Sequence, residues 1–216
     1  VRTEAFLTRM DTPLGRAVGN SVEIAECIDV LSGTGPADLS ELIVRLASRM
    51  VWLGGKSDSE ADAERAVRDS LASGAARDKF RQMITWQGGD PGVVDDTGTL
   101  PQAKHVHHVK AARSGYLQSL DALLVGRTAV ALGAGRDKKA DLVDLSAGVL
   151  LHKKPGDQVA DGETLIELRY NDESRLSAAV ALATQAAVIG DQAPADAPLV
   201  MGWLHENGEQ MFVDGA

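Results

Sequence analysis

Residues 10–26 read MDTPLGRAVGNSVEIAE, and this stretch decides how the first part of the chain folds. A proline and two glycines between residues 13 and 19 fix a tight backbone path. Asn20 and Glu23 stand three residues apart directly before an apolar run, which is the pattern of a capping box. The stretch therefore predicts a loop that leads into an amphipathic helix, which Gly33 ends.

Three further helices are predicted in the first half of the chain. The strongest runs from about Asp38 to Leu53, where apolar residues recur every three or four positions on one face. A weaker helix follows Ser57 or Asp58, and a fourth carries Phe80 before a pair of glycines ends it. Each helix is amphipathic and must pack on something, so the helices either form a bundle or cover a sheet.

The pattern changes after residue 90. Gly, Pro and Asp residues without a clear period predict a linker over residues 90–104. Short apolar runs with turn residues then predict strands, and two longer runs predict helices. The predicted strands cover residues 105–111, 116–120, 148–151, Val159 and 164–170, and the helices cover residues 121–132 and 173–188. The segment 202–216 is rich in glycine and charge and is predicted to add little to the core.

Composition limits the classes of function. Hydrophobic residues make up 44% of the 216 residues and charged residues 25%, as in an ordinary globular protein. The net charge of −9 argues against a nucleic-acid groove, which needs a clustered basic face. The single cysteine, Cys27, excludes an internal disulfide. Since no apolar run approaches the roughly 20 residues that span a bilayer, no membrane partner is expected and a cytoplasmic location is the default.

The loop at residues 13–19 is a candidate cation site. Its proline and glycines can turn backbone carbonyl oxygens inward, and Glu26 lies two helical turns further on. Carbonyl oxygens and one carboxylate are ligands that hard cations prefer. The same residues also suit an ordinary helix entrance with a solvated glutamate, and spacing alone favours that simpler interpretation.

Three histidines that follow the linker raise the question of zinc. His105 and His107 share one face of a predicted strand, and His108 follows them. Two imidazoles without a third ligand do not complete a zinc site. The pattern therefore favours a solvated edge strand, and His152 and His205 are interpreted as surface residues.

Two acidic residues, Asp141 and Asp144, follow the glycine-rich tetrapeptide Gly133-Ala134-Gly135-Arg136. The tetrapeptide comes after a predicted helix instead of a strand, which indicates a helix stop and a turn, not a phosphate-binding loop. The two aspartates are predicted to tie this turn through charge-assisted hydrogen bonds.

A carrier domain with a modified lysine is one alternative. Lys138 and Lys139 precede a Gly-Asp-x-Val-x-x-Gly-x-x-Leu pattern at residues 156–165, and lipoyl and biotinyl domains have a similar spacing. In those domains the lysine lies in a hairpin turn, whereas here a predicted helix precedes the lysines. The likeness is therefore interpreted as a shared sandwich topology. A non-enzymatic scaffold or interaction module is a third possibility.

Two blocks in the same order resemble the pyrimidine-nucleoside phosphorylase and thymidine phosphorylase family. The first runs from Ala5 through MDTPLG to Glu26, and the second runs from LGAGR at residues 132–136 through KPGD at residues 154–157 to Leu165. The helical segment between the blocks also resembles the family, and the likeness covers roughly residues 1–194. Arg9 departs from the pattern, because relatives usually carry an acid there.

The resemblance implies a homodimeric pentosyltransferase of nucleoside salvage, which cleaves pyrimidine nucleosides with inorganic phosphate to the free base and a (deoxy)ribose 1-phosphate. Nucleoside and phosphate would be its partners. The family's catalytic and phosphate-binding residues lie upstream of the matching blocks, so no residue of this chain is assigned a catalytic role. Only nine residues precede Met10 and the first is Val1, so a carboxyl-terminal fragment that is inactive alone is expected.

The resemblance also implies a fold and a metal site. The fold is α/β (α+β within this chain): the back part of the large phosphorylase domain at residues 1–94, a β-rich hammerhead or barrel-sandwich unit at 95–190, and a tail at 191–216. Relatives bind a potassium-type cation, and the matching ligands here are the carbonyls of Leu14 and Ala17 and the carboxylate of Glu26. The cation would be structural and would stiffen the phosphate-binding loop.

Overall fold

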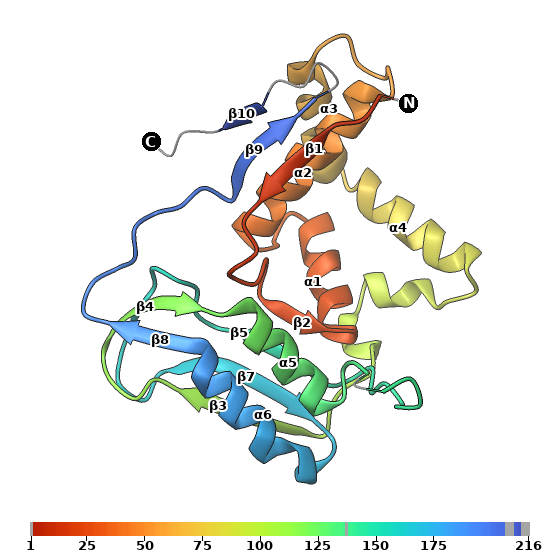
Figure 1. Cartoon of the computed structure of the whole chain (residues 1–216). Coiled ribbons are helices and arrows are strands. Elements are labelled where there is room, and N and C mark those ends of the chain that lie inside the picture. Colours follow the sequence, from red (N-terminus) through yellow and green to blue (C-terminus); the bar gives the residue numbers. More distant parts are fainter. Residues whose placement is uncertain (1, 137, 206–209, 213–216) are drawn as a thin grey trace. The chain divides into compact units, whose positions relative to one another are not determined.

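The computed structural model describes residues 2–136, 138–205 and 210–212, and the chain divides into two compact units (Figure 1). Unit 1 comprises the described parts of Val1–Arg9, Cys27–Asp95 and Ala197–Ala216. Unit 2 comprises Met10–Glu26 and Asp96–Asp196, without residue 137. Both units combine helices with antiparallel strands, so the predicted mixture of α and β structure is confirmed.

Unit 1 is built from helices and one small sheet. Its helices are α2 (Ala37–Leu53), α3 (Glu60–Ala72) and α4 (Ala75–Trp86), followed by the short 3-10 helix η1 (Pro91–Val94), and its sheet has the order β1–β9–β10 (Ala5–Thr8, Val200–Leu204, Gln210–Phe212). The helix α1 (Ser21–Leu31) is divided between the two units after residue 26. These helices lie where the apolar period predicts them. The cap of α3 is Ser59, whose hydroxyl accepts from the Asp62 N–H, and not Ser57 or Asp58.

The carboxyl-terminal tail contributes more than its composition predicts. Strand β9 pairs antiparallel with β1, from Ala5 opposite Leu204 to Thr8 opposite Val200. Val200 and Gly202 are buried and Met201 is exposed, which is the alternation of a half-buried strand. Of the segment 202–216 that is predicted to add little to the core, residues 202–204 belong to this paired strand. Residues 206–209 and 213–216 lie outside the described part of the chain.

Unit 2 holds two antiparallel sheets and two long helices. One sheet has the order β2–β5–β7–β3 (Ala17–Gly19, Gly148–Leu151, Thr164–Tyr170, His105–Lys110), and the other has the order β6–β4–β8 (Gln158–Val159, Gly115–Leu120, Ala187–Gly190). The helices α5 (Ala122–Leu132) and α6 (Glu173–Ala186) pack side by side (Figure 1). Apolar residues from both helices and from strands of both sheets form one core cluster.

Two predictions for residues 90–190 differ from the structure. The helix expected over residues 173–188 ends at Ala186, and Ala187–Gly190 form strand β8, which pairs with β4. Val188 and Ile189 are β-branched, so pairing with β4 outweighs continuation of the helix. The predicted linker holds the 3-10 helices η1 and η2 (Thr97–Thr99). Within the described residues, no helix is long and apolar enough to cross a membrane.

Candidate cation-binding loop

The loop before α1 follows a path that requires glycine at two positions. Gly15 has a φ of 65°, in the left-handed region that glycine adopts without strain. At Gly19, a Cβ atom would lie 2.8 Å from the carbonyl oxygen of Ala147, because the chain passes close to strand β5 there. Residues 17–19 of the predicted loop form strand β2, so only residues 13–16 are a loop in the structure.

The carbonyl of Ala17 faces away from the neighbouring strand. The Leu151 N–H donates to the Arg16 carbonyl at 2.7 Å, and Ala17 stands opposite Leu150 in the ladder between β2 and β5. Because antiparallel residues bond across a ladder in alternation, the peptide groups of Ala17 point to the other side of β2. Strand β2 is at the edge of its sheet, so that side faces away from the sheet.

Glu26 faces the same loop. Its Oε1 accepts a hydrogen bond from the backbone N–H of Arg16 at 2.7 Å. The helical spacing that placed Glu26 near the loop is therefore confirmed, although its role as a metal ligand stays a prediction. Leu14, the remaining predicted ligand, lies at a bend of the loop, and its side chain is exposed.

The helix entrance differs from the predicted capping box. The Glu23 carboxylate accepts from the Gly19 N–H at 2.9 Å, one residue before the expected partner. The Asn20 side chain donates to the carbonyl of Ala134 at 2.8 Å. Both side chains thus hold the segment that joins β2 to α1.

A lysine from a distant part of the chain completes the site. Lys154 Nζ donates to the carbonyl oxygen of Gly15 at 2.6 Å and also to that of Pro13. In return, the Arg16 guanidinium donates to the carbonyls of Leu151 and His152 at 3.1 and 2.8 Å. Sequence reasoning missed the role of Lys154, because 139 residues separate it from Gly15 and no local pattern connects the two.

The loop offers backbone oxygen ligands instead of a cluster of metal-binding side chains. In the part of the chain that the structure describes, no three His, Cys, Asp or Glu side chains are placed to hold a metal ion. A cation at this loop would therefore depend on carbonyl oxygens and on Glu26. Such a ligand set suits a hard monovalent cation better than zinc.

The histidines that invited a zinc interpretation lie on strand β3, which pairs with β7 and is at the edge of its sheet. The predicted edge strand is thus confirmed. Nε2 of His152 lies 3.3 Å from Oε2 of Glu167. Burial raises the pKa of Glu167, but hydrogen bonds and charge from Arg169 and His152 outweigh burial and hold the pKa below its ordinary value.

Asp144 ties the turn after α5, as predicted. Its Oδ1 accepts from the backbone N–H and the hydroxyl of Ser146 at 3.0 and 2.7 Å, and its Oδ2 accepts from Asn171 Nδ2 at 2.6 Å. Burial raises the pKa of Asp144, yet the hydrogen bonds from Asn171 and Ser146 outweigh it and lower the pKa below its ordinary value. Asp141 accepts from the Lys138 N–H at 2.8 Å in the same turn.

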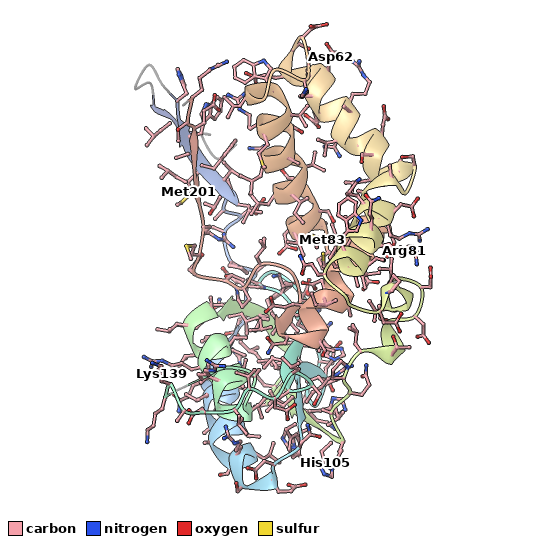
Figure 2. The ribbon with its side chains drawn as sticks, turned by 90° about the vertical axis from the view of Figure 1, so that its right-hand side faces the viewer. Asp62, Arg81, Met83, His105, Lys139 and Met201 are labelled. Atoms are coloured by element: carbon pink, nitrogen blue, oxygen red, sulfur yellow. The ribbon has the colours of Figure 1, made fainter. Side chains whose placement is uncertain are left out.

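The two lysines of the carrier alternative lie in the loop between α5 and β5. Lys138 and Lys139 belong to a turn after a helix, and Lys139 points outward from the ribbon (Figure 2). A carrier domain needs its lysine at the tip of a hairpin between two paired strands. The observed position does not meet that requirement.

Comparison with known proteins gives a family assignment for part of the chain. The Pyrimidine nucleoside phosphorylase C-terminal domain matches residues 116–190. Proteins named pyrimidine-nucleoside phosphorylase from Staphylococcus aureus strains USA300 and COL are each 43% identical to this chain over 169 residues. The matched region is 78% of this chain and 39% of each relative, so the chain spans about two fifths of the length of these curated relatives.

Proposed function

Because the chain belongs to the pyrimidine nucleoside phosphorylase family, we propose that it forms part of an enzyme that cleaves pyrimidine nucleosides with inorganic phosphate. The products are the free base and a pentose 1-phosphate. The observation that carries this proposal is the 43% identity over 78% of the chain to proteins with that name. The complete enzyme is proposed to be a cytoplasmic homodimer in which this chain supplies the back part of the large α/β domain and a β-rich hammerhead or barrel-sandwich unit.

In the proposed reaction, phosphate attacks the anomeric carbon of the sugar while the base departs. The groups that bind phosphate and pyrimidine are expected on parts of the enzyme that match no residue here. This chain contributes the loop at residues 13–19, which Glu26 and Lys154 hold in a defined path. A preorganised loop stabilises developing charge without rearrangement during the reaction.

We further propose that the loop holds a potassium-type cation through the carbonyls of Leu14 and Ala17 and the carboxylate of Glu26. The outward carbonyl of Ala17 and the contact of Glu26 with the Arg16 N–H support this ligand set. All three ligands are oxygen groups, which hard cations prefer. The proposed role of the cation is structural: it would stiffen the phosphate-binding loop.

A chimeric enzyme tests the proposed reaction. Residues of this chain replace the matched 169 residues of the Staphylococcus aureus relative, and phosphate-dependent release of thymine from thymidine is measured. The chimera is expected to release thymine only when phosphate is present, and the isolated chain is expected to release none. A folded chimera without phosphorolysis, next to an active parent enzyme, would reject the proposal. Activity of the isolated chain would show that the catalytic groups have been misplaced.

A further inference from the structure

The lysine at the loop points to a feature that the proposed function does not include. Lys154 Nζ contacts the carbonyl oxygens of Pro13 and Gly15. Neither carbonyl belongs to the proposed cation ligands, which come from Leu14 and Ala17. The positive charge of the Lys154 ammonium therefore already offsets part of the negative potential of the carbonyl oxygens in this loop.

Lys154 is mounted on a rigid turn. The Asp157 N–H donates to the Lys154 carbonyl at 3.0 Å, and the Asp157 carboxylate accepts from the Lys154 N–H at 2.8 Å. Pro155 and Gly156, which has a φ of 97°, occupy the two central positions, as in a type II turn. The backbone of Lys154 therefore has little freedom to withdraw the ammonium from the loop.

Backbone hydrogen bonds join this turn to the core of unit 2. The Gly156 N–H donates to the Leu117 carbonyl at 2.8 Å, and the Leu117 N–H donates to the Asp157 carbonyl at 2.9 Å. Leu117 is fully buried. This arrangement distinguishes Lys154 from an ordinary surface lysine, whose side chain adopts many rotamers.

We propose that Lys154 is a built-in cation of the loop: its ammonium positions residues 13–16 and reduces the stabilisation that the loop gains from a bound potassium ion. The positive charge of the ammonium repels a second cation bound at the same loop and weakens its binding, and this repulsion gives the result. Prior ordering of the loop acts in the opposite direction, because an ion that meets an ordered loop loses less conformational entropy, so the inference requires the repulsion to be the larger effect. This inference rests on the cation part of the proposed function and makes Lys154 a positioning residue.

The neighbouring Lys153 provides a matched control. Its Nζ pairs with Glu163 at 2.7 Å and donates to the Gln158 carbonyl at 3.1 Å, and both partners lie outside residues 13–16. Lys153→Met therefore removes a charge of the same kind one residue away. A change that appears in Lys154→Met and is absent from Lys153→Met reports the contact with Pro13 and Gly15.

The test compares unfolding temperatures of the whole chain in choline chloride and in potassium chloride at equal ionic strength. Lys154→Met is expected to unfold several degrees lower than Lys153→Met in choline chloride, and its stabilisation by potassium is expected to be at least about twice that of the unchanged protein. If potassium raised the unfolding temperature of Lys154→Met by no more than it raises that of the unchanged protein, the inference would be overturned. A general loss of packing would lower the unfolding temperature in both salts and leave the potassium shift unchanged.

Two milder variants keep the test decisive if Lys154→Met does not fold in either salt. Lys154→Gln removes the charge and keeps a hydrogen-bond donor, and it is expected to show the enlarged potassium response. Lys154→Arg keeps the charge and is expected to respond as the unchanged protein does. Equal responses of the two variants would overturn the inference.

Glu26→Gln separates this inference from the proposed cation site. In the Lys154→Met background, Glu26→Gln is expected to abolish the additional potassium response. A response that persists would reject Glu26 as a ligand and leave the effect of Lys154 intact. Failure of the chimera to catalyse phosphorolysis would reject the enzyme proposal without altering either salt measurement.

Discussion

The two units of this chain obtain their stability in different ways. The largest fully buried side chains among the described residues all lie in unit 2, including Leu117, Leu151, Ile166 and Leu168. In unit 1, helix α4 has no buried residue, and Met50 and Trp86 are largely exposed. Unit 2 therefore holds the largest fully buried apolar side chains, although both units expose others, such as Met50 in unit 1 and Leu142 in unit 2.

Unit 1 contains a charged cluster around a largely buried arginine. The guanidinium of Arg49 bridges the carboxylates of Glu4 and Glu60, each at 2.5 Å, and lies 4.6 Å from the ring centre of Trp52. The side chain of Glu4 is only 6% exposed, so its charge depends on this partner. Arg49 on α2 thus links the residue that precedes β1 with the first residue of α3.

The largest expected effect tests the apolar side of this comparison. Leu168→Ala removes a fully buried side chain from β7 and is expected to destabilise unit 2 by about 3 kcal/mol, through lost transfer energy and the cavity left behind. Amide hydrogen exchange in β5 and β7 measures the change within unit 2 alone. Leu46→Ala, at a residue that is 40% exposed in α2, is the control and should cost far less. Similar costs at both sites would contradict the contrast between the units.

The second prediction, with a smaller expected effect, tests the charged cluster around Arg49 in unit 1. Arg49→Met is expected to destabilise unit 1 by about 2 kcal/mol, because Glu4 keeps a buried charge without its arginine. Exchange of the amides in β1 and α2 reports the loss. The exposed pair of Arg65 with Asp62 provides a control, and Arg65→Met should have a much smaller effect. Little change in Arg49→Met would show that unit 1 does not depend on this cluster.

The sequence predicts those elements whose residues form a regular pattern within one continuous segment. Helices α2 and α5 were predicted close to their observed bounds, because their apolar residues recur along one continuous segment. Strands β1 and β2 were missed, since runs of four and three residues are too short to show alternation. The pairing of β2 with β5 is also remote in sequence, and it appears only when the chain folds.

The residues of the candidate site also differ in whether a local sequence pattern could place them. Glu26 could be placed near the loop from helical spacing, because both belong to one continuous stretch. Lys154 could not, since its contact with Gly15 depends on how β5 and the following turn bring a remote segment to β2. The carbonyl direction at Ala17 likewise follows from the ladder with β5, and no residue pattern carries that information.

The smallest expected effect asks whether unit 2 also depends on a polar contact. Asp144→Asn is expected to cost about 1 kcal/mol near neutral pH, because the amide cannot accept all the bonds from Ser146 and Asn171. The folded-state pKa of Asp144 is lowered from 3.8, so its contribution is present above that pH and is lost as pH falls through the folded pKa. Urea unfolding of both proteins between pH 7 and pH 3 measures the difference, which should shrink only below about pH 4. A difference that stays constant across this range would assign the cost to packing, and unit 2 would then depend on apolar burial alone.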